Sequence, residues 1–190
     1  MALVLIAGPL TEPITLAQAK AHLRVDTMDE DILISSLILT SRLHIEAALG
    51  LALITQSWQL TLNAWPKGNA VPLPLHPVVA VTTVKTIAAN GTSTTLAPSA
   101  TVLDAGPPAR VVNVSQLWPV VTAAANGIAI TLTAGFGPTA DDVPAPIRQA
   151  LLLLVAHWYE HRDPIEIGEP QTAIPKAVSD LLMPYRRPRL

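Results

Sequence analysis

The residues best arranged for chemistry are two histidines and a glutamate in the segment His157-Trp158-Tyr159-Glu160-His161. This order matches the H-x-x-E-H pattern of inverted zinc peptidases. Two histidines four residues apart share one face of a helix and can hold Zn²⁺, while the neighbouring glutamate can activate a metal-bound water. One interpretation is therefore a small zinc-dependent hydrolase that uses His157, Glu160 and His161.

Such a zinc site needs a third protein ligand, and the nearest downstream acids are Glu166 and Glu169, in a segment that contains proline and glycine. The simpler interpretation is that His157 caps the core and that residues 160–162 form the solvated end of a buried helix. Their charges would complement the helix dipole there. The sequence favours this second interpretation, and we expect neither a metal nor a cofactor.

A second chemical feature is the arginine-rich arm at residues 185–190. Pro184 and Pro188 prevent this segment from forming a helix. Its guanidinium groups could bind carboxylates or phosphates through paired hydrogen bonds, with an apolar residue at each end as an anchor. Composition alone leaves two alternatives open, a free basic tail and a docked arm. The candidate contact residues are Tyr185, Arg186, Arg187, Arg189 and Leu190.

Four helices are predicted around these features. Thr15 and Gln18 form a capping-box pattern at the start of a short helix over residues 15–25. A longer helix over residues 29–49, closed by Gly50, has apolar residues on more than one stripe and is predicted to be buried on two sides. Residues 147–162 have apolar side chains on both faces and predict a central helix. A short helix follows at residues 176–183.

The middle of the chain has β character, because residues 47–140 contain only four charged residues among many threonines and valines. Asn90-Gly91 is a strong hairpin signal. Prolines 72, 74 and 77 cannot donate to a sheet, so residues 72–77 are predicted to form an edge or a loop. Strands are predicted over residues 55–62, 78–87, 92–96, 101–104, 110–114 and 128–134.

Composition restricts the function classes. Charged residues make up 14% of the chain, against about 25% in typical soluble domains, and we therefore expect identical copies to cover part of its surface. The apolar run at 150–159 is shorter than the ~20 residues of a membrane-spanning helix, and residues 1–10 lack the basic region of a signal peptide. A net charge of -2 argues against a general attraction to nucleic acid, and the lack of cysteine excludes disulfides.

The predicted fold is α+β: a small bundle of four helices with a β-rich insertion between the second and third helices. We expect a single domain over residues 1–190. Its helical part would comprise residues 13–50 and 141–184, its insertion residues 54–136, and its C-terminal arm residues 185–190.

Four segments of the sequence resemble one family. They are PITLAQAKAHLRVD at residues 13–26, LGLALITQSWQLTL at 49–62, AGFGPTADDVPAPIRQALLLLVAHWYEHRD at 134–163, and IPKAVSDLLMPYRRPRL at 174–190. In this order and spacing they are similar to head-tail connector proteins, also called adaptor or head-completion proteins, of long-tailed double-stranded-DNA bacteriophages and gene transfer agents. The β-rich middle is less similar.

The resemblance implies a structural virion protein without catalytic activity. Copies would form an adaptor ring, expected to be dodecameric, that joins the portal at the capsid vertex to the next neck or tail-completion protein. The ring would continue the DNA channel without binding the DNA specifically. The expected location is the head-tail junction of the virion, after assembly in the bacterial cytoplasm.

The same resemblance implies that the arm at 185–190 docks onto the portal and that the histidine motif belongs to an ordinary central helix. No membrane partner is expected. An unrelated oligomeric scaffold remains a further alternative to the adaptor and the zinc-dependent hydrolase.

Overall fold

The computed structural model describes residues 1–115, 117–161 and 174–186. Within them the chain forms four α-helices and eight strands in antiparallel sheets, which confirms the predicted α+β class, and seven of the strands lie between the second and third helices. The contacts divide the chain into two compact units. The helical unit comprises Leu10–Leu49 and Gly137–Leu190, and the β unit comprises Met1–Pro9 and Gly50–Phe136.

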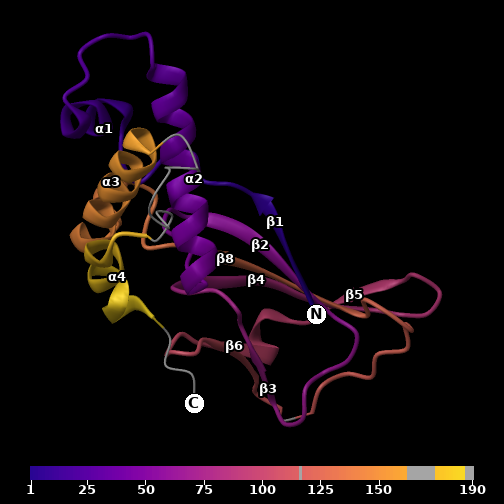
Figure 1. Ribbon diagram of the computed structural model, residues 1–190. Helices are drawn as coiled ribbons and strands as arrows, with labels where there is room; N and C mark the ends of the chain where they lie inside the picture. The colour runs from indigo at the N-terminus through magenta and orange to yellow at the C-terminus, as the bar shows by residue number, and fades with distance from the viewer. Residues whose placement is uncertain (116, 162–173, 187–190) are drawn as a thin grey trace, which may run out of the picture. The chain divides into compact units, whose positions relative to one another are not determined.

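Figure 1 labels the α-helices and most of the strands along the chain. The α-helices are α1 (Leu16–Leu23), α2 (Asp31–Leu49), α3 (Ala145–Glu160) and α4 (Lys176–Leu182). The strands are β1 (Ala2–Ala7), β2 (Gln56–Leu62), β3 (Ala70–Pro72), β4 (Val78–Ile87), β5 (Ser93–Thr95), β6 (Thr101–Asp104), β7 (Arg110–Asn113) and β8 (Ile128–Ala134). Three short 3₁₀ turns are η1 (Pro98–Ala100), η2 (Ala140–Asp142) and η3 (Met183–Tyr185).

Helix α1 begins as its sequence predicts. The Thr15 hydroxyl accepts a hydrogen bond from the Gln18 N–H at 3.1 Å, and the Gln18 side chain accepts one from the Thr15 N–H at 2.8 Å. This capping box satisfies two amide groups that the first turn leaves free. Arg24 ends α1 with a φ of 59°, and Gly50 follows α2 with a φ of 65°. That left-handed conformation is the one expected of a glycine after a helix.

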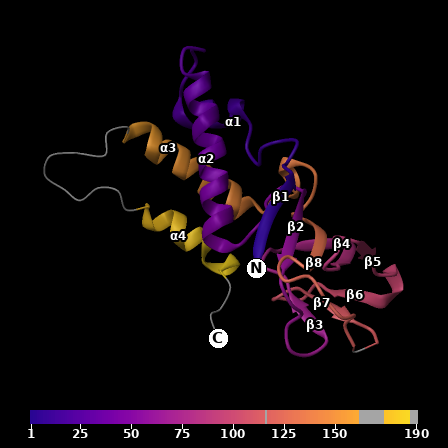
Figure 2. The ribbon, with the colours of Figure 1, turned by 90° about the vertical axis from the view of Figure 1, so that its right-hand side faces the viewer.

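Helix α3 is the central helix of its unit, as predicted. It packs against α1, α2 and α4, and Figure 2 shows α4 beside it. No residue from Ala150 to Tyr159 is exposed. Its fully buried side chains recur at helical spacing and are those of Ile147, Ala150, Leu151, Leu154 and Val155.

Helix α2 is buried on one side only, which corrects the prediction of burial on two. Ile34, Ile38 and Ile45 lie in the core of the unit, with exposed fractions of 0%, 3% and 0%. Leu39 and Leu43 point away from it and are 43% and 50% exposed. The second apolar face predicted from the sequence is present, but the described chain does not cover it.

Helix α2 is long and apolar enough to be compared with a membrane-spanning helix. It has 19 residues with a mean hydropathy of 1.5 over an 18-residue window, so by length and composition it could cross a membrane. Among the described residues, Asp31–Leu49 and not residues 150–159 is therefore the segment that meets the length and hydropathy of a spanning helix. A core helix passes the same test, and a third of this window is buried.

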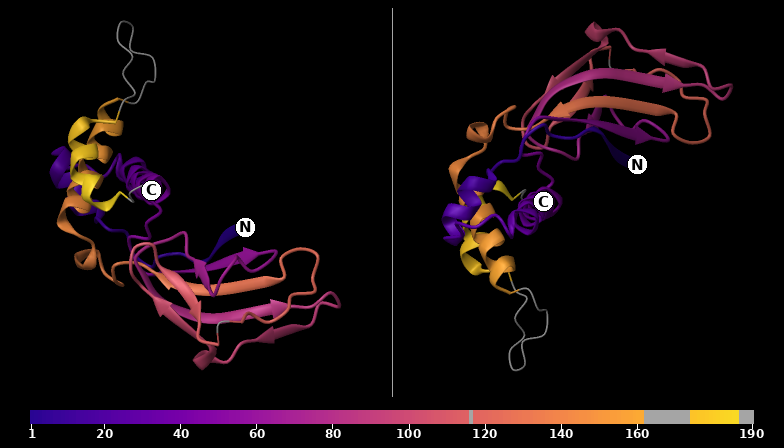
Figure 3. Two further views of the ribbon diagram at one scale, coloured as in Figure 1. Left: turned by 90° about the horizontal axis from the view of Figure 1, so that it is seen from below. Right: turned by 90° about the horizontal axis from the view of Figure 1, so that it is seen from above.

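The β unit contains two antiparallel sheets, which Figure 3 shows from two sides. One has the strand order β1-β2-β8-β4-β5 and the other β3-β7-β6. Strand β8 buries Ile128, Ile130, Leu132 and Ala134 on one face, as expected for a sheet with one face in the core, and Ala129 on the other face is buried as well. Both sheets contribute to one aliphatic cluster, which includes Leu60 of β2 and Val111 of β7.

Most strand boundaries match the prediction to within one or two residues, but β1 and β3 were not predicted. Strand β1 pairs with β2 along the edge of the first sheet, where Leu3 faces Leu60 and Leu5 faces Trp58. Its continuous apolar sequence has no alternation to reveal a strand. Strand β3 is an edge strand that ends at Pro72, in agreement with the predicted edge position of that proline.

Candidate functional site

The histidine motif lies at the C-terminal end of α3, in the helical unit. The His157 and His161 rings are 4.7 Å apart between centroids, at an interplanar angle of 35°. His161 Nδ1 lies 2.8 Å from the His157 carbonyl oxygen and donates to it, while the His161 N–H donates to the same oxygen at 3.0 Å. These contacts satisfy a carbonyl in the last turn, which otherwise lacks a partner within the helix.

The charge state of His157 follows from its surroundings. Burial lowers the pKa of this imidazole and the neighbouring His161 lowers it further, while the Glu160 carboxylate opposes the shift only in part. This shift favours the neutral imidazole over the charged one. A neutral imidazole could ligate a metal. Whether the histidine motif could bind one therefore depends on how many further ligand side chains lie near it.

The described residues contain no group of three or more histidine, cysteine, aspartate or glutamate side chains that could hold a metal ion. Glu166 and Glu169, considered above as third ligands, lie outside the described residues. Within the part of the chain that the structure describes, the motif thus has the geometry of a helix end.

Sequence reasoning missed an ion network on the buried side of α2. The Arg42 guanidinium donates from Nε to Glu12 at 2.7 Å and from Nη1 to Glu46 at 2.9 Å, and Nη2 also reaches Glu12 at 3.2 Å. Arg42 and Glu46 are only 5% and 8% exposed. Burial alone would lower the pKa of Arg42, but the Glu12 hydrogen bond and the Glu46 charge outweigh it, and the pKa is raised.

The network joins α2 to the segment that precedes α1. Arg42 and Glu46 are an i, i+4 pair, which the sequence could have revealed, because they are the only charges between Ile32 and Leu49. Glu12 lies 30 residues away, and no local pattern predicts that contact. The arrangement fixes the position of α2 and does not resemble a catalytic site.

Further polar contacts fix the other helix ends of this unit. Lys20 of α1 binds Asp31 at the start of α2 at 2.5 Å and the Thr27 carbonyl oxygen at 2.7 Å. The Tyr159 hydroxyl of α3 bonds to Glu30. The His44 and Trp158 rings meet edge to face at 5.7 Å, which links α2 to α3.

The two aspartates before α3, Asp141 and Asp142, also have side-chain partners. Asp142 accepts hydrogen bonds from the Thr139 N–H at 2.8 Å and the Thr139 hydroxyl at 2.7 Å, and these bonds lower the pKa of Asp142. Asp141 binds Arg148 at 2.7 Å. Both acids thus stabilise the turn that leads into α3.

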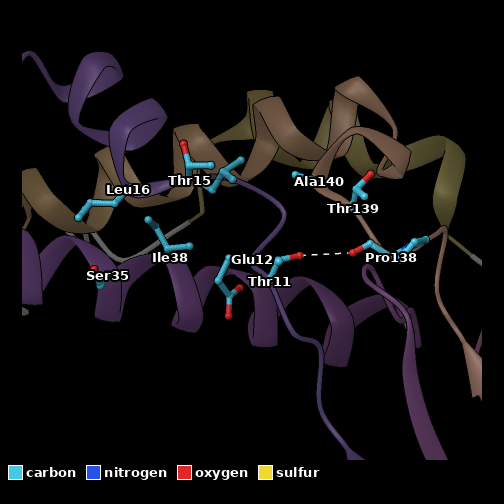
Figure 4. Close-up of a pocket in the computed structure, with 10 residues that line it drawn as sticks. Thr11, Glu12, Thr15, Leu16, Ser35, Ile38, Pro138, Thr139 and Ala140 are labelled. Atoms are coloured by element: carbon cyan, nitrogen blue, oxygen red, sulfur yellow. Dashed lines mark hydrogen bonds between the residues drawn. The ribbon is translucent and has the colours of Figure 1, made fainter.

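A shallow pocket of about 410 Å³ lies in the helical unit (Figure 4). Glu12 is the one charged residue in its lining, and Arg42 neutralises that charge. The Thr11 hydroxyl donates to the Pro138 carbonyl oxygen across the pocket at 3.5 Å. The described lining of the pocket contains no histidine, cysteine or lysine, and its one carboxylate is paired with Arg42.

The structure describes only the beginning of the C-terminal arm. Val178 and Leu182 anchor α4 in the core, and η3 follows it. Tyr185 is half-buried and Arg186 is exposed, with the Arg186 N–H donating to the Met183 carbonyl oxygen at 3.2 Å. The other three candidate contact residues lie outside the described residues; they are Arg187, Arg189 and Leu190.

A family model and several solved structures match nearly the whole chain. A model of the head completion protein family matches residues 12–188. A chain in the neck of an empty gene transfer agent (GTA) particle, computed with C6 symmetry, is 28% identical, with a TM-score of 0.87 and coverage of 100% of this chain and 97% of that chain. Comparison with curated proteins found no match.

Two further structures give the same result, each with coverage of 100% of this chain and 97% of theirs. A chain in the virion of the native GTA particle is 28% identical with a TM-score of 0.86. A chain in the neck of the native GTA particle, computed with C12 symmetry, is 27% identical with a TM-score of 0.84. These matches confirm the resemblance carried by the four sequence segments.

Proposed function

This chain belongs to the head completion protein family, and from that premise we propose that it is a structural protein of the virion neck. Copies of the chain form an adaptor ring between the portal at the capsid vertex and the next neck or tail-completion protein. The observation that carries the proposal is the full-length similarity to chains in the necks of GTA particles. The proposed role is structural and involves no catalysis.

The symmetry of those particles supports a ring. The similar chains come from necks computed with C6 and C12 symmetry, and we propose twelve copies for this protein. The composition agrees, because a chain with 14% charged residues and 50% apolar residues is expected to cover surface against its neighbours. In a closed ring, one surface of each copy contacts a different surface of the next copy.

The proposed ring continues the channel through which double-stranded DNA passes. The chain's net charge is -2. A strongly basic lumen would bind the phosphate backbone and retain the DNA, so a charge near zero suits passage without specific binding. We also propose that the protein assembles in the bacterial cytoplasm and that its final position is the head-tail junction of the virion.

We assign the portal contact to the arm at residues 185–190. Arg186 is exposed where α4 and its 3₁₀ turn end. The contact residues are Tyr185, Arg186, Arg187, Arg189 and Leu190. Their guanidinium groups would bind acidic groups of the portal through paired hydrogen bonds.

Native mass spectrometry and electron microscopy of the purified protein, alone and with purified portal rings, test the proposal. We expect rings, and complexes in which such a ring sits on a portal. A folded protein that forms no ring in either condition contradicts the function.

A variant in which residues 185–190 are replaced by a Gly/Ser segment of equal length tests the arm. It should keep the circular dichroism spectrum of the wild type and bind portal rings at least about tenfold more weakly. Portal binding equal to that of the wild type contradicts the assignment of the arm and leaves the ring itself untouched.

A further inference from the structure

Helix α2 buries its charged residues together with one apolar stripe and leaves a second apolar stripe exposed. Arg42, Glu46 and Ser41 are buried, at 5%, 8% and 0% exposure, whereas Ile32 is 88%, Leu39 43% and Leu43 50% exposed. A helix at the surface of a lone protein normally turns its charges to water and its apolar stripe to the core. Here the charges are satisfied inside the unit by the Arg42 network.

The exposed residues form a continuous seam, which we call the α2 stripe. It consists of Ile32, Ser36, Leu39, Leu43 and Ala47. Their intervals are four, three, four and four residues, so they lie along one face of the helix. No charged residue is exposed anywhere on α2 between Ile32 and Leu49. Such a seam has the pattern of a helix that packs against another helical surface.

Full-length similarity to the GTA neck chains supports another copy of this chain as the partner. Those chains occupy particles computed with C6 and C12 symmetry, and a cyclic arrangement gives every copy an identical neighbour on each side. Contacts between ring neighbours join two different surfaces. An apolar seam on each copy therefore requires a different receiving surface on the next.

A lipid bilayer is a poorer match to the stripe. Helices that lie on membranes carry lysine or arginine beside the apolar face and often a tryptophan within it. The exposed positions of α2 have neither, since they are occupied by aliphatic residues, alanine, serine, threonine and one histidine, His44.

The receiving surface can be located within the same unit. A groove of about 470 Å³ lies between α1 and α3, with Gln18 and Ala21 on one side and Ala145 and Gln149 on the other. Alanines at such positions let a second helix approach closely. The glutamine side chains can bond to the Ser36 hydroxyl of the stripe, and Leu152 adds apolar area. The lining also includes His22 and Arg148, and Asp141 balances the charge of Arg148.

We propose that the α2 stripe of each copy packs into the α1–α3 groove of its neighbour and that this contact closes the ring. The inference rests on the proposed function and adds to it the surfaces that meet. It explains why α2 keeps an apolar outer face while its charges are paired inside.

Cysteine cross-linking tests the contact directly, because the chain has no cysteine. We expect the double variant Leu39→Cys with Ala21→Cys, treated with a short bismaleimide, to give a ladder of covalent oligomers on a denaturing gel. Each single variant should stay monomeric on that gel, as should the matched pair Leu39→Cys with Val79→Cys. Val79 is 59% exposed but belongs to β4.

The other cross-linking outcomes contradict the proposal. Dimers from Leu39→Cys alone would show that α2 meets α2, which is a two-fold contact and not a ring contact. Rings that form normally in the double variant, but give no ladder, would show that the stripe and the groove do not meet.

Leu39→Asp gives a second test that does not depend on cross-linking. A charge placed in the contact should raise the protein concentration needed for ring formation at least about 100-fold. The monomer should keep its circular dichroism spectrum, since Leu39 lies outside the core. Val79→Asp is the matched control and should form rings like the wild type.

Two outcomes separate this inference from the function on which it rests. A wild-type protein without rings contradicts both, whereas rings that persist unchanged in Leu39→Asp contradict the inference alone. Flotation with phosphatidylcholine–phosphatidylglycerol vesicles covers the membrane alternative. The wild type should not float, and flotation that Leu39→Asp abolishes would overturn the proposed partner.

Discussion

The helical unit and the β unit are stabilised by different interactions. Among the described residues, four ion pairs lie in the helical unit, and the Arg42 network among them is largely buried. The described β unit has one ion pair, between Arg110 and Asp104, whose side chains are 51% and 41% exposed. Its aliphatic cluster instead spans two sheets. Both units have an apolar core, but buried charge adds to the fixing of helix positions in the helical unit and has no described counterpart in the β unit.

The largest expected effect comes from removing the cation of the buried network. Arg42→Met should reduce the free energy of unfolding by about 3–5 kcal/mol, because it leaves the buried Glu46 carboxylate without its guanidinium partner. Urea unfolding followed by circular dichroism at 222 nm measures the loss. Arg110→Met is the matched control in the β unit, where the exposed pair contributes little. Equal losses for the two variants would remove the contrast between the units.

The β unit should respond most to a cavity. Leu60 is 0% exposed in the aliphatic cluster, and Leu60→Ala should cost roughly 3 kcal/mol through lost burial and the space left behind. Tryptophan fluorescence reports mainly on this unit, which contains Trp58, Trp65 and Trp118, whereas the fourth tryptophan, Trp158, lies in α3. Leu39→Ala, the same substitution at an exposed position, should change monomer stability by less than about 0.5 kcal/mol. Similar costs for both would contradict the burial described here.

A smaller effect is expected at the capping box of α1. Thr15→Ala removes the hydroxyl that accepts from the Gln18 N–H and should cost about 1 kcal/mol. Amide hydrogen exchange within α1 should accelerate correspondingly. Thr94→Ala, at an exposed position of β5, is the control and should leave exchange in α1 unchanged. Unaltered protection of α1 in Thr15→Ala would show that tertiary packing alone fixes this helix.

The smallest effect concerns pH. The pKa of His157 is lowered in the folded protein, so below about pH 6.5 the unfolded state takes up a proton more readily than the folded state does. Stability from this group is complete above that pH and is lost as the pH falls toward the folded-state pKa. His157→Gln should flatten the dependence of unfolding free energy on pH between 7 and 5. An unchanged slope in this variant would assign the dependence to other groups.

Features determined by neighbouring residues were predictable from the sequence. Thr15 and Gln18 reveal the start of α1 because their side chains bond across three residues. Strands β4 and β8 were located correctly because β-branched and alternating residues give a signal within the strand itself. Gly50 marked the end of α2 for a similarly local reason.

Features that depend on distant contacts were not predictable. One partner of Arg42 is Glu12, 30 residues away, and β1 becomes a strand through pairing with β2, whose paired residues lie 50 or more positions along the chain. The apolar faces of α2 predicted burial on two sides, whereas only one side is buried in the described chain, because local sequence does not show what lies against a helix face. The histidine motif was visible at once, yet only its place at the end of α3 showed which chemistry its surroundings allow.

The connections of the chain have a mechanical consequence. The polypeptide passes from one unit to the other three times, after Pro9, after Leu49 and after Phe136. A protease that cuts one of these connections leaves the units covalently tied by the remaining two, so no single break releases either of them.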